Sequence, residues 1–85
     1  MTEFSRNDLL AEVATLMISL RTERGHTLEA AAHLAHLDPE RLAQAEAGEI
    51  ALDENELQNL ADAYDVSITA FFGGKVTPVA YLFGA

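Results

Sequence analysis

The first quarter of the chain has apolar side chains at the spacing of one helix face. They recur every three or four residues, at Leu9, Val13, Leu16 and Leu20. This period predicts an amphipathic helix over Asp8–Glu23. The helix is expected to end at Arg24-Gly25, because a basic side chain suits a last turn and glycine readily takes the left-handed conformation that follows it.

The stretch from Thr27 to Gly48 predicts two short helices joined by a tight turn. The first is Leu28–Ala35, capped by Thr27, and the second is Pro39–Ala47, capped by Asp38. Asp38 accepts from free N–H groups of the first turn, and Pro39 loses nothing at the first helical position. Gly48 is expected to close the second helix. Helices with so short a link cross steeply, which is the helix-turn-helix arrangement.

The same periodicity assigns faces to these two helices. The expected inward positions are Ala31, Ala32, Ala35, Leu42 and Ala45, with Leu37 in the turn. The expected outward positions of the second helix are Pro39, Glu40, Arg41, Ala43, Gln44 and Ala47. Leu28 and Leu34 fall off the inward stripe, so one or both of them are expected to be exposed.

Two more helices are predicted after a loop over Glu49–Leu52. Asp53 with Glu56 three residues later gives a capping box in its Asp form. The positions Leu57, Leu60, Ala61 and Tyr64 form the buried stripe of the helix that follows, and it stops at Asp65. Ser67 then caps a short helix, Ile68–Phe72, that buries Phe71 or Phe72. The chain is therefore predicted to be all-α with five helices.

The end of the chain differs from the rest. Residues 1–74 form the expected helical domain, and residues 75–85 form an apolar tail in which Pro78 argues against a continuous helix. Four tail residues are predicted to make a twofold interface, as an edge strand or packed across the last helix: Val79, Tyr81, Leu82 and Phe83. The alternative is that the tail covers the core of its own chain.

Composition excludes several classes of protein. Fourteen acidic and five basic residues give a net charge of −9, there is no cysteine, and no apolar run is long enough for a membrane span. No catalytic motif or phosphate loop is present, so neither an enzyme nor a cofactor is expected. His33 and His36 share a predicted helix face but lack a third ligand, so no metal site is expected either. A cytoplasmic protein is the default.

Several motifs resemble one regulator family. The run Leu20 to Thr27, Leu-Arg-Thr-Glu-Arg-Gly-His-Thr, is similar to the junction of the first two helices in the Cro/phage-repressor (XRE) helix-turn-helix family. Glu46-Ala47-Gly48 resembles the Glu-x-Gly that closes its recognition helix, and Leu57–Phe72 resembles its last two helices. The resemblance implies a five-helix transcriptional regulator that binds double-stranded operator DNA in the major groove as a homodimer.

The resemblance also implies an ion pair between Arg21 and Glu46, which in this family ties the first helix to the third. The residues alone agree, since both lean inward and a half-buried charge needs a partner. The alternative is a pair of solvated surface charges.

The DNA-binding surface implied by the resemblance is unusually acidic here. Thr27 is placed to donate to a phosphate, whereas Leu28 stands where the family usually has glutamine. Pro39, Glu40, Arg41 and Gln44 lie on the recognition helix, but Arg41 is the only Arg or Lys between Thr27 and Ile50. Two functions follow. One is a dimeric DNA-binding regulator in which Arg41, Gln44 and Glu40 contact bases while Thr27 and the start of its helix contact phosphate. The other is an antirepressor-like interaction module that has lost DNA binding and contacts a basic protein partner.

Overall fold

The computed structural model describes residues 6–73, which form four α-helices and one short 3₁₀ helix. The elements are α1 (Arg6–Glu23), α2 (Leu28–Leu34), α3 (Pro39–Glu46), α4 (Glu54–Tyr64) and the 3₁₀ helix η1 (Ile68–Phe72). No strand occurs in this part of the chain. The tail residues Val79, Tyr81, Leu82 and Phe83 lie outside the described residues, so their place in an interface stays a prediction.

The all-α class is confirmed, but the count of five α-helices is wrong. The segment Ile68–Phe72 has five residues between its cap, Ser67, and Gly73, which is left-handed with φ 69°. In so short a segment the backbone closes with tighter bonds of the i→i+3 type, as when Ala70 N–H donates to the Ser67 carbonyl at 2.9 Å. The fifth element is therefore a 3₁₀ helix.

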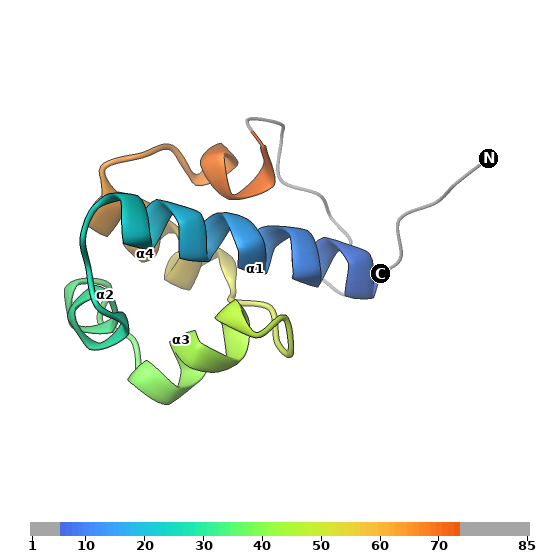
Figure 1. Cartoon of the computed structure of the whole chain (residues 1–85), viewed down its shortest axis with the longest axis horizontal. Helices are drawn as coiled ribbons and strands as arrows, with labels where there is room; N and C mark the ends of the chain where they lie inside the picture. Colours follow the sequence, from blue (N-terminus) through green and yellow to red (C-terminus); the bar gives the residue numbers. More distant parts are fainter. Residues whose placement is uncertain (1–5, 74–85) are drawn as a thin grey trace.

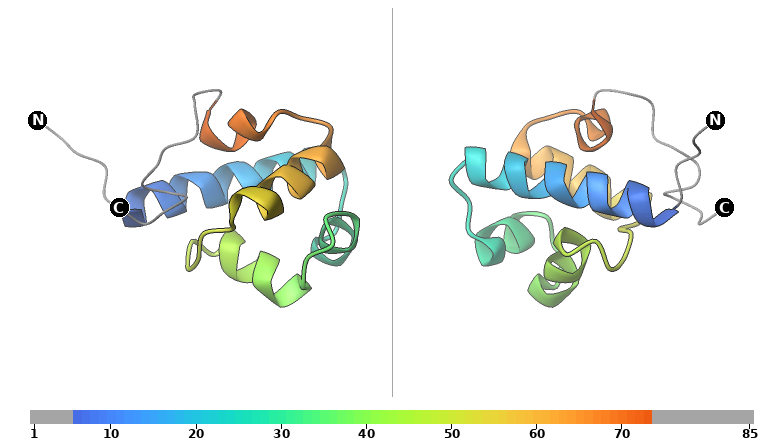
Figure 2. Two further views of the ribbon diagram at one scale, coloured as in Figure 1. Left: turned by 180° about the vertical axis from the view of Figure 1, so that it is seen from behind. Right: turned by 45° about the vertical axis from the view of Figure 1, so that its right-hand side comes forward.

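Helices α1 and α4 form the middle of the fold and separate α2 and α3 from η1 (Figure 1). In Figure 1, α1 crosses the middle of the molecule, with α2 and α3 on one side and η1 on the other. Figure 2 shows the same division from behind, where α4 crosses α1 between α3 and η1. In agreement, α1 contacts both α3 and η1, and α4 contacts both α2 and η1. The last described residues thus lie on the side of the fold opposite the α2–α3 unit.

The predicted inward stripes meet in one core. Both Phe71 and Phe72 are buried, where only one was expected, and Leu52 of the predicted loop is buried as well. The core consists of Leu10, Val13, Met17, Ala31, Ala32, Ala35, Leu42, Ala45, Leu52, Leu57, Leu60, Ala61, Tyr64, Phe71 and Phe72. The small alanines of α2 are buried, as their spacing predicted, and α2 contacts both α3 and α4.

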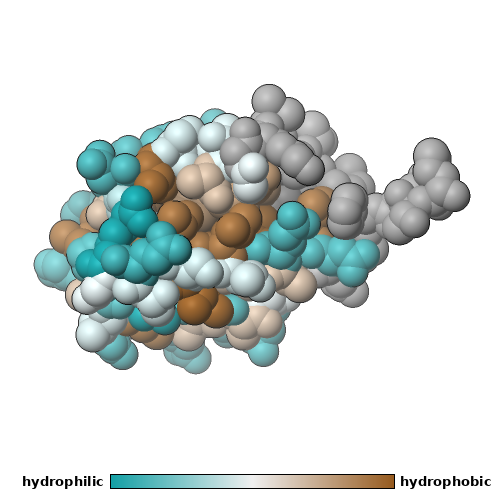
Figure 3. Space-filling model, turned by 45° about the horizontal axis from the view of Figure 1, so that its top comes forward, coloured by the Kyte–Doolittle hydropathy of each residue, from teal (hydrophilic) through white to brown (hydrophobic). Residues whose placement is uncertain are grey.

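Little large apolar surface remains among the described residues. Leu34 is 49% exposed and Ile18 is 38% exposed, whereas Leu28 packs partly against the core. On the face that brings η1 forward, apolar patches are bordered by hydrophilic side chains (Figure 3). None of the helices within residues 6–73 is both long and apolar enough to cross a membrane.

Candidate nucleic-acid interface

Local sequence signals fix both ends of α3. The Asp38 carboxylate accepts from Glu40 N–H at 2.9 Å, and Pro39 occupies the first turn. At the other end Gly48 adopts φ 75°, a conformation that few other residues take at low cost. A side chain at Gly48 would also approach the backbone of Ala11 on α1, at 3.6 Å from its Cα. The helix is therefore held at a set length and close to α1.

The two faces of α3 have opposite character. Leu42 and Ala45 are buried against the core, as predicted. Glu40, Ala43, Gln44 and Ala47 are exposed on the opposite face. These four positions carry one amide, one carboxylate and two methyl groups, which are the kinds of group that contact base edges in a major groove.

Arg41 and Glu46 lie between these two faces. Because successive helical residues are about 100° apart, each lies roughly 70° from the middle of the Leu42–Ala45 stripe, on opposite edges. Arg41 was expected on the outward face, and it is instead partly buried beside α4. The two edges of α3 are thus each tied to a neighbouring helix by an ion pair.

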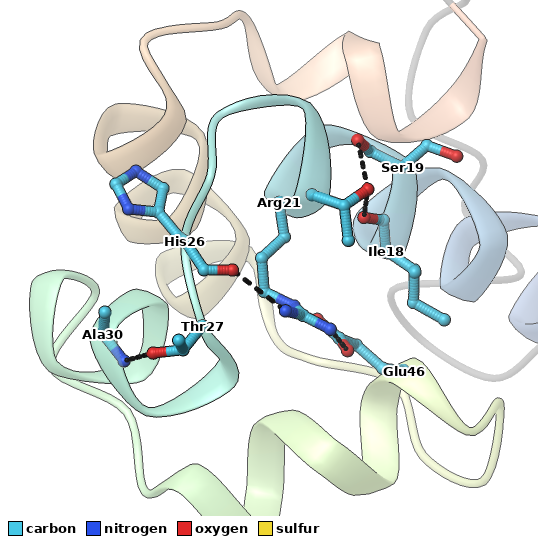
Figure 4. A network of polar contacts seen from close by, with 8 residues as sticks. Ile18, Ser19, Arg21, His26, Thr27, Ala30 and Glu46 are labelled. Carbon is cyan, nitrogen blue, oxygen red and sulfur yellow. Dashed lines mark hydrogen bonds and ion pairs between the residues drawn. The ribbon is translucent and has the colours of Figure 1, made fainter.

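Arg21 and Glu46 form the first pair (Figure 4). Arg21 Nε donates to Glu46 Oε2 at 2.8 Å and Nη2 donates to Oε1 at 3.0 Å, in a bidentate arrangement. Arg21 Nη1 also donates to the His26 carbonyl at 3.0 Å, which ties the α1–α2 loop to the same group. The two side chains are only 17% and 8% exposed. The hydrogen bonds from Arg21 to Glu46 raise the pKa of Arg21 further above its already high usual value.

The aromatic ring of Tyr64 lies close enough to this pair for the charges of both its members to act on it. The Tyr64 ring stacks on His26 with centroids 5.9 Å apart and meets the edge of Phe71 at 6.3 Å. Its hydroxyl is buried and finds no hydrogen-bond partner among the described residues. Burial strongly raises the pKa of Tyr64, with a further increase from Glu46 and a smaller opposite effect from Arg21. The Arg21–Glu46 pair is therefore largely, though not fully, shielded from water and lies beside a buried aromatic side chain.

The second pair joins Arg41 on α3 to Glu56 on the first turn of α4. Arg41 Nη2 donates to Glu56 Oε1 at 2.8 Å, and Nε donates to Oε2. Glu56 Oε1 also accepts from Asp53 N–H at 2.9 Å, which completes the predicted capping box. The hydrogen bonds from Arg41 lower the pKa of Glu56, and those from Asp53 lower it further against the opposing effect of burial. Sequence reasoning identified the capping box and missed the ion pair.

The start of α2 offers less to a ligand than the resemblance implies. The Thr27 side chain is exposed and its oxygen accepts from Ala30 N–H at 3.1 Å, so it acts as a helix cap. Leu28 is partly buried against the core and so is not fully presented at the surface. Glu29 is the exposed side chain at this end of α2.

The charge around α2 and α3 is negative. Four exposed carboxylates lie there, Glu29, Asp38, Glu40 and Glu49, and none of them forms an ion pair within residues 6–73. The arginines whose side chains are described all have carboxylate partners: Arg21 with Glu46, Arg24 with Glu23 and Arg41 with Glu56. The positive charge of Arg41, the only cation of this unit other than histidine, is therefore compensated within the protein.

His33 and His36 are not arranged on one helix face to bind a metal ion. His36 lies in the turn after α2 with φ 57°, so it does not share a helix face with His33 as the sequence suggested. Within residues 6–73 no group of three or more His, Cys, Asp or Glu side chains is placed to hold a metal ion. A hollow of about 260 Å³ is lined by Leu34, His36, Asn59, Asp62 and Ala63, and none of these belongs to α3.

Comparison with known proteins identifies the family. Residues 17–71, more than half of the chain, match the profile of the HTH_3 helix-turn-helix family. No curated protein is similar enough in sequence to count as a match.

Solved structures with the same arrangement of helices are regulators. The restriction-modification controller protein C.AhdI from Aeromonas hydrophila is 27% identical, with a TM-score of 0.72 over 74% of this chain and 96% of that protein. A mutant of the restriction-modification controller protein C.Esp1396I is 28% identical, with a TM-score of 0.70 over 76% of this chain and 84% of that one.

A third structure belongs to a longer protein. An HTH_3 family transcriptional regulator from Vibrio cholerae is 28% identical with a TM-score of 0.77, over 84% of this chain but only 40% of that protein. The profile match, the α2–α3 geometry and these neighbours agree, and the chain belongs to the HTH_3 helix-turn-helix family of XRE-type transcriptional regulators.

Proposed function

We propose that this chain binds double-stranded operator DNA as a homodimer and places α3 in the major groove. The observation that carries the proposal is the outer face of α3, which stays uncovered while its inner face and both edges are fixed to the rest of the fold. A rigid helix with one open polar face is the part that enters the groove in helix-turn-helix proteins.

Gln44 is the side chain best suited to recognise a base on this face. Its amide can donate to N7 and accept from N6–H of adenine at once, and such a bidentate contact discriminates by about 1–3 kcal/mol. Glu40 can accept from the amino group of cytosine, and Ala43 and Ala47 are small enough to contact thymine methyl groups. The proposed half-site therefore contains an A·T pair opposite Gln44.

Phosphate contacts are proposed to be few. Thr27 retains a hydroxyl that can donate to a phosphate, and Pro39 and Leu28 can line the approach to the backbone. The four carboxylates around α2 and α3 that form no ion pair within residues 6–73 repel the negatively charged DNA backbone, however. Because phosphate contacts supply most sequence-independent affinity, the expected binding is weak on random DNA and shallow in its salt dependence.

The homodimer is proposed to form through the tail residues Val79, Tyr81, Leu82 and Phe83. The fold supports this placement because η1, after which the tail begins, lies on the side of α1 opposite α3 (Figure 1). A twofold contact there leaves both recognition helices accessible. Sedimentation of a chain truncated after Gly74 tests it: a truncated chain that dimerises as the full chain does removes the tail from the interface.

The proposed function is tested by fluorescence anisotropy at low salt, with labelled genomic fragments from the source organism. Saturable binding of some fragments over others at micromolar protein is the expected result. Absence of binding to every fragment at that concentration would end the proposal.

A second function is favoured by one observation, the negative charge around α3. In this alternative the helix-turn-helix unit contacts a basic protein partner and binds no DNA. Exposed Leu34 would supply apolar contact and Glu29, Glu40 and Glu49 the charge. Binding of a basic DNA-binding protein, together with no binding of DNA, would favour this alternative.

A further inference from the structure

The Arg41–Glu56 pair has a geometry that matters for the proposed DNA contact. Glu56 is the inner member, with a side chain only 17% exposed, and Arg41 is the outer member at 42%. Glu56 is fixed by a second hydrogen bond, from Asp53 N–H at 2.9 Å. The guanidinium of Arg41 is therefore bound on its inner side by a carboxylate whose rotamer is fixed by a second hydrogen bond.

We propose that Glu56 is a positioning residue that raises the DNA specificity of this regulator by holding the Arg41 guanidinium in a compensated ion pair. This inference builds on the proposed DNA-binding function. A DNA phosphate that engages Arg41 must share its guanidinium charge with the Glu56 carboxylate or displace that carboxylate. Arg41 therefore adds little to sequence-independent attraction, and discrimination is left to side chains such as Gln44 on the outer face.

The expected size of the effect follows from counterion release. Each phosphate neutralised by a protein cation steepens the plot of log K against log salt by about 0.9. Removing the Glu56 charge would let Arg41 act as such a cation. The DNA affinity at about 50 mM salt divided by that at about 200 mM salt would then be about three- to fourfold larger than in the wild type for each recognition helix.

The test uses the full chain with Glu56→Gln and a duplex of random sequence. Glutamine keeps the capping-box hydrogen bond to Asp53 while it removes the charge. The matched control is Glu54→Gln, which removes the same charge from the same helix turn. Glu54 is exposed and has no ion-pair partner within the described residues.

Glu56→Gln is expected to bind the random duplex about tenfold more tightly at about 50 mM salt, with the steeper slope given above. Glu54→Gln is expected to change the affinity by less than about threefold and to leave the slope as in the wild type. A gain in affinity is a result that a merely structural role for Glu56 would not produce, because loosening the fold weakens binding.

The double variant decides whether Glu56 acts through Arg41. In the Arg41→Ala background the Glu56→Gln change should have no effect on the slope, and Arg41→Ala alone should change random-duplex affinity by no more than about twofold. The inference would be overturned if Glu56→Gln raised the random-duplex affinity equally with and without Arg41, or if Glu54→Gln and Glu56→Gln had equal slopes. Operator binding by the wild type would still support the proposed function in either case. Failure of every variant to bind DNA at low salt would overturn both.

Discussion

Two arginine–carboxylate pairs hold α3, and they share a bidentate geometry but differ in how far they are exposed. Both are bidentate, and they lie on opposite edges of the same buried Leu42–Ala45 stripe. The Arg21–Glu46 pair is 17% and 8% exposed and lies beside the buried Tyr64, whereas the Arg41–Glu56 pair is 42% and 17% exposed.

This difference in burial assigns different roles to the two pairs. A buried pair cannot lose one partner without leaving an unpaired charge in a poorly screened interior. The outer pair differs at its arginine, which is 42% exposed, and its inner member Glu56 would keep the hydrogen bond from Asp53 N–H if Arg41 were lost. The Arg21–Glu46 pair therefore acts on the stability of the fold, and the Arg41–Glu56 pair acts mainly on what the recognition helix presents to a ligand.

The largest expected effect is on the buried pair. Arg21→Ala should lower the free energy of unfolding by about 3 kcal/mol or more, because Glu46 would be left charged and nearly buried and the His26 carbonyl would lose its donor. Urea unfolding followed by circular dichroism measures this. A loss below about 1 kcal/mol would mean that the pair is solvated, and the contrast between the two edges would disappear.

The corresponding change in the outer pair should be much smaller. Arg41→Ala is expected to cost less than about 1 kcal/mol, since exposed ion pairs are weak and Glu56 keeps its hydrogen bond with Asp53. The same urea titration provides the measurement, with Arg21→Ala as its reference. If the two variants were equally unstable, Arg41 would have to be counted with the scaffold.

The smallest effect is a pH dependence of the outer pair. Because the pKa of Glu56 is below its usual value of 4.5, its stabilising contribution is present above that pH and is lost as pH falls through the lower, folded-state pKa. The difference in melting temperature between wild type and Glu56→Gln should thus be constant near neutral pH and shrink below about pH 4.5. Thermal melts at several pH values test this, and a difference that grows on acidification would contradict the assignment.

Most of the fold could be predicted because its signals are local. Asp38-Pro39, Gly48 and the Asp53–Glu56 box each fix a helix end with residues close in sequence, and all three lie where expected. The periodic stripe of α4 likewise identified its buried residues. The bounds of η1 were predicted correctly, but its 3₁₀ character was missed although five residues are few enough to favour i→i+3 hydrogen bonds.

The candidate site was harder to predict because its geometry depends on how helices pack. Arg41 and Glu56 are fifteen residues apart and meet only because α4 begins beside the edge of α3. The capping box already gave Glu56 a partner, so the sequence offered no reason to seek another. The Arg21–Glu46 contact was expected from the family resemblance, and the inward position of both charges on their predicted helices agreed with it. The helical angle of Arg41, roughly 70° from the buried stripe, was the signal that could have placed it at an edge.

Selection of bound duplexes from a random pool determines whether the outer face of α3 recognises base edges. Wild type and Gln44→Ala would be compared at the same low salt. The wild type should enrich a two-fold-symmetric site with an A·T pair at a fixed position in each half. The variant should lose about 1–3 kcal/mol of discrimination at that position alone. No enrichment by the wild type, or the same preferred site for both proteins, would contradict recognition by this face.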